Sequence, residues 1–373
     1  MMEIVVPLDQ AQFSSEERLL LRTPELEATG FRYRTGIPAV RLANARGHVI
    51  VLPWMGQIVW DATFDGIRLT MQSLFDAPRP ASCIVDTYGC YAFHSGLLRN
   101  GCPGPEDTHT LHGEFACAVM DSAQLVLTQI ETGWALRVES ELVHAQGFGS
   151  RYRATARVTL PATATLFDIG LAVENTGGRT MDLMYMCHIN PAFAEGASIV
   201  QPAPYLPETV RVRHVVPAHE PSTTSLLKTI ARLAEDPAPS ATLDGSVPYD
   251  PEQVFYLHGI GASDDGATRL MLRRPDGDGF AMAFNLNDFP HVVRWLMKTE
   301  DHAVAAFALP STCEPEGFLA EQRKGNVVRL SPGQMRRFSV TTGYVDRAAA
   351  GTWASEIATL SLRSTLPTEC AKP

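Results

Sequence analysis

The chain has 373 residues, of which 45% are hydrophobic and 19% are charged, and its formal net charge is −10. This composition is typical of a globular protein with a large core, and the negative charge argues against nucleic acid or an anionic membrane as a partner. No apolar run is long enough to span a bilayer, and we expect no signal peptide. The seven cysteines, which include Cys370, contain no Cys-x-x-Cys pair. They therefore predict reduced thiols in a cytoplasmic protein.

The predicted elements begin with a short helix and continue almost entirely as strands. Residues 14–25, SSEERLLLRTPE, predict a helix that is capped by a serine and ends before Pro24. Hairpin turns are indicated near Ala45–Gly47 and at Asp65–Gly66, since Asp-Gly is a strong hairpin signal.

Apolar and polar residues then alternate with the period of a strand through most of the chain. In residues 166–174, one face carries Phe167, Ile169, Leu171 and Val173. From Ala39 onward, helices are expected only at 223–235 and near 352–362. The sequence therefore predicts an all-β fold, a large antiparallel β-supersandwich. We expect this domain to span residues 39–345, with an N-terminal extension (1–38) packing on it and a C-terminal tail (346–373).

Three polar, turn-rich stretches interrupt the alternation, at residues 91–115, 185–193 and 309–326. The first contains LHGEF, in which His112 and Glu114 would share one face if they lay on a strand. Gly113 would leave the opposite face open to another backbone or a ligand. A strand-end histidine beside a solvated glutamate is an almost equally good interpretation. His-x-Glu can also supply two metal ligands, so a metal site stays open.

The second stretch places His188 near the end of a predicted strand. Alternation puts it on the same face as Met184, Met186 and Asn190, which is typical of a hydrogen-bonded core histidine as much as of a catalytic one. Asn190 and Pro191 should end the strand, because proline cannot donate to a sheet. His188 is therefore expected at a rim where ligands bind, where an imidazole can exchange protons near neutral pH.

The third stretch places Glu314 and Glu316 on either side of Pro315, directly after the apolar run AVAAFALP. A carboxylate at the end of a buried strand can serve as a general base. A charged loop is the more common role of a Glu-Pro-Glu segment, and this motif alone favours that interpretation.

Taken together and in order, these motifs resemble those of the aldose 1-epimerase (galactose mutarotase-like) superfamily, and most closely its bacterial epimerase-like branch. The resemblance covers roughly residues 39–344. Its motifs are GLLRNG at 96–101, LHGE at 111–114, VENTGGRTMDLMYMCHIN at 173–190, CEPEG at 313–317 and LSPGQ at 330–334. Three motifs depart from the family pattern: His-Gly-Glu replaces His-Gly-Gly, His-Ile-Asn-Pro replaces His-x-Tyr-Phe-Asn, and the usual Asn-Arg order appears as Arg99–Asn100.

Carried over residue by residue, the resemblance implies that His188 is a general acid and Glu314 a general base. It implies that His112 and, approximately, Arg99 bind sugar hydroxyls. Glu114 and Asn190 complete the expected substrate-binding set.

The expected activity is the interconversion of aldose anomers by acid–base ring opening and closure, with no metal and no cofactor. One alternative is a metal-dependent sugar isomerase or epimerase with His112, Glu114 and His188 as ligands. Another is a non-catalytic carbohydrate-binding protein that uses the same cleft. The expected partner is a small sugar, with no nucleic acid or membrane, and a homodimer is one option for assembly.

Overall fold

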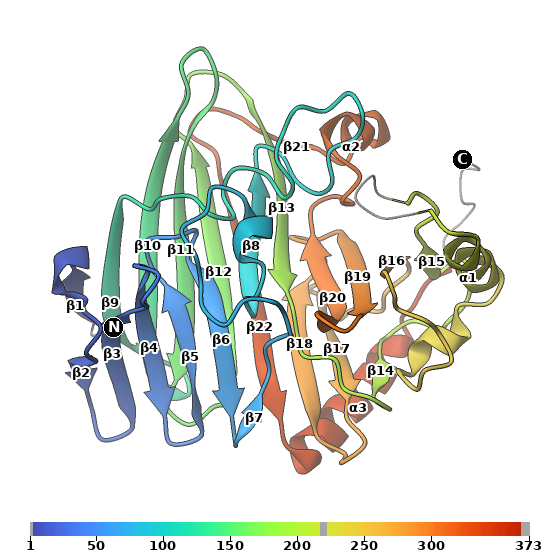
Figure 1. Cartoon of the computed structure of the whole chain (residues 1–373), viewed down its shortest axis with the longest axis horizontal. Coiled ribbons are helices and arrows are strands. Elements are labelled where there is room, and N and C mark those ends of the chain that lie inside the picture. Colours follow the sequence, from blue (N-terminus) through green and yellow to red (C-terminus); the bar gives the residue numbers. More distant parts are fainter. Residues whose placement is uncertain (1–2, 217–221, 367–373) are drawn as a thin grey trace. The chain divides into compact units, whose positions relative to one another are not determined.

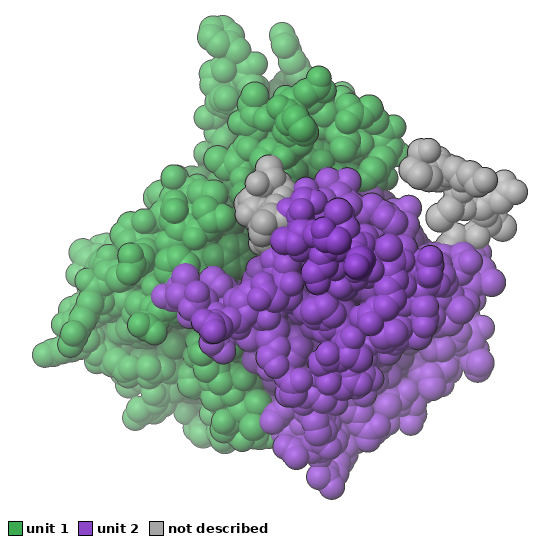
Figure 2. Space-filling view, turned by 45° about the vertical axis from the view of Figure 1, so that its right-hand side comes forward, with its two compact units in different colours: residues 1–70, 75–188, 315–343 green, residues 71–74, 189–314, 344–373 purple. Residues whose placement is uncertain are grey.

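The computed structural model describes residues 3–216 and 222–366, so Cys370 lies outside the described residues. The chain divides into two compact units, which Figure 2 colours separately. Unit 1 consists of Met1–Thr70, Phe75–His188 and Pro315–Gly343. Unit 2 consists of Met71–Leu74, Ile189–Glu314 and Tyr344–Pro373.

Unit 1 contains two large sheets (Figure 1). The strands of the first, in spatial order, are β1 (Glu3–Leu8), β9 (Ser122–Ile130), β10 (Gly133–Ala145), β11 (Arg151–Pro161), β12 (Leu166–Asn175) and β22 (Met335–Val345). The strands of the second are β13 (Met181–Ile189), β8 (Ala92–Leu97), β6 (Ile58–Phe64), β5 (Gly47–Leu52), β4 (Pro38–Asn44), β3 (Leu26–Arg32) and β2 (Arg18–Arg22). The shorter elements are β21 (Val328–Leu330) beside β13, β7 (Ile67–Arg68) beside β6, the 3₁₀ turns η1 (Gln10–Gln12) and η2 (Ile84–Thr87), and helix α2 (Phe318–Lys324).

The two sheets of unit 1 face each other across a shared apolar core. The ring of Phe64 on β6 lies 6.1 Å from the ring of Phe167 on β12. The amide of the buried Gln57 donates to the carbonyl oxygens of Val138 on β10 (3.0 Å) and Ala156 on β11 (2.8 Å). The apolar face expected on residues 166–174 is buried in β12. The predicted β-sandwich is confirmed.

Both predicted hairpin turns are present in unit 1. β4 pairs with β5 as far as Asn44 and Gly47, and β6 pairs with β7 as far as Phe64 and Ile67. In the second turn Asp65 and Gly66 have φ angles of 48° and 78°. Two successive positive φ angles match the right-handed twist of a hairpin and favour Asp-Gly.

Unit 2 contains seven strands among its described residues. Four form one sheet, in the order β15 (Val210–Val212), β16 (Gln253–Leu257), β19 (His291–Lys298) and β20 (Ala303–Ser311). The other three are β14 (Ser198–Val200), β17 (Ala267–Arg273) and β18 (Gly279–Asn285). The remaining elements are α1 (Thr224–Glu235), the 3₁₀ turn η3 (Ala238–Ala241) and α3 (Arg347–Ser361).

The two longer helices confirm the expectations for 223–235 and 352–362, although α3 begins five residues earlier than expected. The side chain of Thr223 caps α1 by accepting from the N–H of Leu226, and Asp346 caps α3 by accepting from that of Ala349. No helix in the described part of the chain is long and apolar enough to cross a membrane.

The helix expected in residues 14–25 is wrong. Arg18–Arg22 forms strand β2, which pairs with β3 in a register that sets Arg18 opposite Gly30. Pairing with a neighbouring strand outweighs a weak local helix propensity, because most of the stability of a short element comes from its tertiary contacts.

Candidate functional site

His112 and His188 come together in unit 1. Their ring centroids lie 4.9 Å apart, with the ring planes nearly perpendicular. Both residues are buried, at 8% and 3% exposure. They reach this point from segments that are 76 residues apart in the sequence, because β8 and β13 are neighbours in the second sheet. The structure therefore groups two of the predicted site residues.

Aromatic groups hold His188 in a fixed orientation. Its ring stacks on that of Phe93 on β8, at 4.5 Å between centroids and 14° between planes. Its Nε2 atom lies 3.2 Å from the hydroxyl oxygen of Tyr88, close enough for a hydrogen bond. β13 ends at Ile189, before Asn190 and Pro191, as predicted. His188 is thus a buried, oriented, titratable group at the end of a strand.

His112 lies in a turn, and the expectation that it shares a strand face with Glu114 is wrong. His112 and Gly113 have φ angles of 62° and 74°, in the left-handed region. A Cβ atom on Gly113 would lie 2.0 Å from the carbonyl oxygen of Arg99, so this position requires glycine. The Nδ1 atom of His112 lies 2.9 Å from the hydroxyl oxygen of Ser95. The turn sends Glu114 into a different environment from that of His112.

Glu314 belongs to unit 2, in a turn directly after β20. The buried Ser311 shapes this turn, since its hydroxyl donates to the carbonyl of Cys313 (2.6 Å) and accepts from the N–H of the same residue (3.2 Å). The Glu314 side chain is 7% exposed, and its Oε1 atom accepts a hydrogen bond from Nη2 of Arg211 at 3.0 Å. A guanidinium therefore fixes one oxygen of this carboxylate.

Arg211 and His258 surround Glu314 within unit 2. The guanidinium of Arg211 lies 5.3 Å from the centre of the Tyr256 ring, and the Arg211 side chain is 39% exposed. Burial and then the Arg211 charge lower the pKa of His258, and the Glu314 charge opposes this shift. His258 is therefore neutral near pH 7. Asn190 also belongs to unit 2, where it is buried and its carbonyl accepts from the N–H of Met71 at 3.1 Å.

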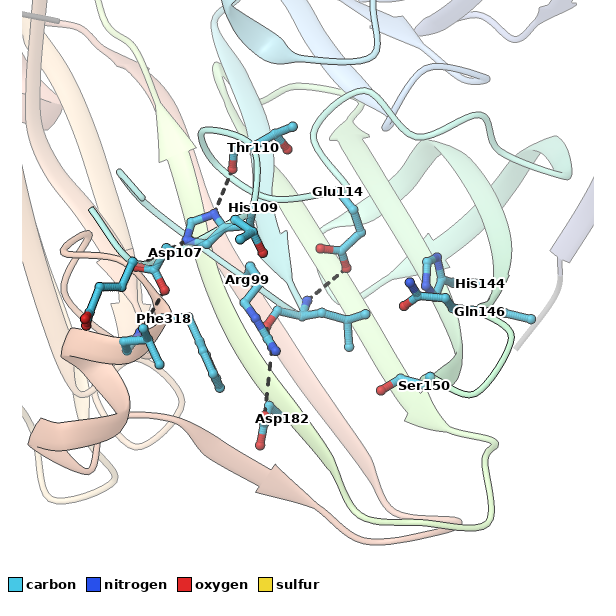
Figure 3. Close-up of a pocket in the computed structure, with 16 residues that line it drawn as sticks. Arg99, Asp107, His109, Thr110, Glu114, His144, Gln146, Ser150, Asp182 and Phe318 are labelled. Carbon is cyan, nitrogen blue, oxygen red and sulfur yellow. Dashed lines mark hydrogen bonds and ion pairs between the residues drawn. The ribbon is translucent and has the colours of Figure 1, made fainter. Parts of the chain in front are cut away.

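Arg99 and Glu114 line a cavity of about 680 Å³ that lies wholly within unit 1 (Figure 3). We call it the strand-end cavity. Neither His112 nor His188 lines it. Its ionisable side chains come from the loop after β8, the ends of β10 and β13, and the residues before β9: Arg99, Glu106, Asp107, His109, Glu114, His144 and Asp182. The structure thus separates the predicted substrate-binding residues of unit 1 into two groups.

A family model described as "Domain of unknown function (DUF4432)" matches residues 34–343. The chain belongs to this family. No curated protein matches its sequence. Its membership of DUF4432 identifies the domain but names no activity.

Solved structures with the same fold give the family a structural context. A "putative aldose 1-epimerase" from Klebsiella pneumoniae has a TM-score of 0.77 and 14% identity, with 96% of each chain covered. A galactose mutarotase-like protein from Clostridium acetobutylicum has a TM-score of 0.58 and 11% identity, covering 87% of this chain and all of the other. The expected galactose mutarotase-like fold is confirmed.

His112, Glu114 and His188, the ligands of the alternative metal site, are not grouped to hold an ion. Oε1 of Glu114 accepts from the N–H groups of Leu97 (3.0 Å) and Leu98 (2.9 Å) and from the hydroxyl of Tyr152 (3.0 Å). Glu114 therefore lines the strand-end cavity rather than joining His112 and His188. Within residues 3–216 and 222–366, no three His, Cys, Asp or Glu side chains are grouped to hold a metal ion.

Sequence reasoning missed the residues that orient the two proposed catalytic groups. Tyr88 and Phe93 position His188, and Arg211 positions Glu314. A signal for Arg211 was present in the segment TVRVRH, where arginines alternate with the buried Val210 and Val212. Tyr88 follows the short turn η2, and no periodic pattern singles it out.

Proposed function

We propose that this DUF4432 protein is an aldose epimerase that interconverts sugar anomers, with His188 as the acid and Glu314 as the base. The observation that carries the proposal is the setting of His188, an imidazole that is 3% exposed, stacked on Phe93 and in contact with the Tyr88 hydroxyl. The similarity to the Klebsiella protein, a "putative aldose 1-epimerase", supports the same reaction class, as does a buried carboxylate fixed by a guanidinium.

The reaction needs one base and one acid. Glu314 removes the proton from the anomeric hydroxyl while His188 protonates the ring oxygen, so the bond between C1 and the ring oxygen breaks and an aldehyde forms. Rotation about C1–C2 then exposes the other face of the aldehyde. Ring closure returns both protons in the reverse sense and gives the other anomer. The substrate neither gains nor loses atoms.

The neighbouring side chains act as positioning or binding residues in this proposal. Tyr88 and Phe93 hold the His188 ring, which fixes the direction in which its proton travels. Arg211 orients the carboxylate of Glu314 by donating to its Oε1 atom. His112, with its Nδ1 atom at the Ser95 hydroxyl, is assigned to a sugar hydroxyl.

Exchange NMR across a panel of neutral, acidic and phosphorylated aldoses tests the activity. Glu314→Gln keeps the volume of the side chain but cannot accept the proton, and His188→Asn removes the titrating ring. Each change should slow anomer exchange by about two to four orders of magnitude. The loss should fall on kcat rather than KM, because proton transfer stabilises mainly the transition state.

Matched controls are Glu316→Gln, two residues from Glu314, and His48→Asn on β5; both should keep the wild-type rate. If Glu314→Gln exchanged anomers as fast as the wild type, the proposed acid–base mechanism would be refuted. A wild type that binds aldoses but accelerates the exchange of none would establish the carbohydrate-binding alternative instead.

A further inference from the structure

The strand-end cavity has the size and chemistry of a small-molecule site. Its volume of about 680 Å³ falls within the usual range for such sites, and all of its lining residues belong to unit 1. Four carboxylates and one guanidinium line it, which leaves a formal excess of three negative charges when the histidines are neutral. The proposed epimerase reaction uses none of these groups.

The existing cation in the cavity is already engaged. The guanidinium of Arg99 stacks on the Phe318 ring at 3.6 Å and donates to the carbonyl of Leu98 at 2.6 Å. It also lies 3.9 Å from a carboxylate oxygen of Asp182, whose other oxygen accepts from Arg329 at 2.7 Å. The two guanidinium groups therefore offset the negative charge of Asp182. They leave Arg99 poorly placed to neutralise the other carboxylates.

Glu114 is a fixed carboxylate without a cationic partner among the described residues. Its Oε1 atom accepts hydrogen bonds from three neutral donors, which are the N–H groups of Leu97 and Leu98 and the hydroxyl of Tyr152. Burial and the Glu114 charge raise the pKa of Tyr152, so its hydroxyl stays protonated and continues to donate. No described residue donates a hydrogen bond to Oε2, the other oxygen of the carboxylate. Figure 3 shows the Glu114 carboxylate directed into the cavity.

His109 adds a second acceptor. Its side chain is only 8% exposed, and its Nδ1 atom lies 2.8 Å from the carbonyl oxygen of Thr110. A carbonyl can only accept, so Nδ1 carries the proton and Nε2 presents a lone pair in the neutral ring. Nε2 makes no hydrogen bond with any described residue, and the nearby Asp107 oxygen, at 3.9 Å, is also an acceptor. A buried acceptor without a donor is costly, so a donor group brought to Nε2 would be favoured.

His144 also lines the cavity. Its ring stacks on that of Tyr152 at 4.7 Å, and its Nε2 atom is buried without a hydrogen bond to any described residue. Gln146 and Ser150 lie beside it in the loop between β10 and β11 (Figure 3). The cavity therefore combines a carboxylate that has no cationic partner among the described residues, two imidazoles and neutral polar groups.

We propose that the strand-end cavity binds a small organic ammonium ion that also carries hydroxyl groups, of the amino sugar or amino alcohol class. The ammonium group pairs with Glu114, and the hydroxyls donate to His109 and accept from the neutral side chains. A neutral polyol satisfies the hydrogen bonds but not the charge, and an anionic sugar is repelled by the carboxylates. Neither His188 nor Glu314 lines this cavity.

Calorimetric titration of the full chain tests the proposal with two acyclic probes, N-methyl-D-glucamine and D-glucitol. Neither has an anomeric centre, so neither is turned over by an epimerase. The glucamine should bind at least tenfold more tightly than the glucitol, because a hydrogen bond between charged groups contributes more than a neutral one. The imidazole NMR signals of His109 and His144 should shift during the same titration.

Variants locate the site. Glu114→Gln should weaken glucamine binding at least tenfold, and His109→Phe, which keeps a ring but removes the lone pair, should weaken it several-fold. Glu141→Gln removes the same charge from an exposed position on β10 and should leave the affinity within twofold. Glu314→Gln should also leave it unchanged, which separates this site from the proposed catalytic one. Absent binding, equal affinity for glucitol, or unaltered binding in both Glu114→Gln and His109→Phe would overturn the proposal.

Discussion

Replacement of Arg211 by methionine gives a sharp test of how Glu314 is held. The guanidinium donates to Oε1 of Glu314 at 3.0 Å, and the two side chains are 39% and 7% exposed. A hydrogen bond between charged groups contributes about 1.5–3 kcal/mol, and exposure of the arginine reduces this to about 1–2 kcal/mol. If this energy orients the base in the transition state, kcat should fall by about 5- to 30-fold, at 1.36 kcal/mol for each factor of ten.

The assay is exchange NMR on whichever aldose the wild type interconverts, with kcat and KM measured separately. KM should change little, because Arg211 acts through Glu314. Arg211→Lys keeps the charge but loses the planar donor geometry, so its rate should lie between those of the wild type and Arg211→Met. Loss of a neighbouring cation also makes a carboxylate a stronger base. A rise in kcat in Arg211→Met would therefore show that basicity matters more than orientation, and would refute this reasoning.

Two further predictions concern unit 1. Tyr88→Phe keeps the aromatic ring but removes the hydroxyl 3.2 Å from Nε2 of His188, so kcat for anomer exchange should fall about 2- to 12-fold at constant KM; an unchanged kcat would contradict a positioning role. Burial lowers the pKa of His94 from 6.5 to about 4, so between these pH values the unfolded chain binds the proton and the folded chain does not. Stability should therefore fall as the pH falls through this window, by about 3 kcal/mol for this group, and urea unfolding of His94→Phe should lack that part of the pH dependence. Equal pH dependence in the two proteins would rule out this contribution.

The sandwich could be predicted because its signals are local. A period of two along residues 166–174 reports a strand with one buried face, and Asp65–Gly66 reports a turn that needs two positive φ angles. The helix prediction for residues 14–25 was wrong because three consecutive leucines fit a helix and a strand equally well. Pairing with β3 decides between them, and that pairing depends on residues elsewhere in the chain.

The candidate site was less predictable, since its residues act through contacts distant in sequence. His188 and His112 were identified, but the tyrosine that contacts His188 lies 100 residues away and the arginine that holds Glu314 lies 103 residues away. The alternation rule also failed at His112 and Glu114, because it assumes an extended backbone. The backbone there is left-handed, and no spacing rule reveals that.

The turn at His112 and Gly113 explains how one short motif contributes to two environments. In a strand, side chains two residues apart point the same way and would meet at one site. Two successive left-handed residues reverse the chain instead, so His112 packs against His188 while Glu114 receives the N–H groups of Leu97 and Leu98. The carbonyl of Arg99 closes so tightly on Gly113 that no side chain fits. The extra carboxylate of His-Gly-Glu is therefore compatible with an acid–base site at His188. The backbone turns Glu114 away from His112 and His188 and into the strand-end cavity.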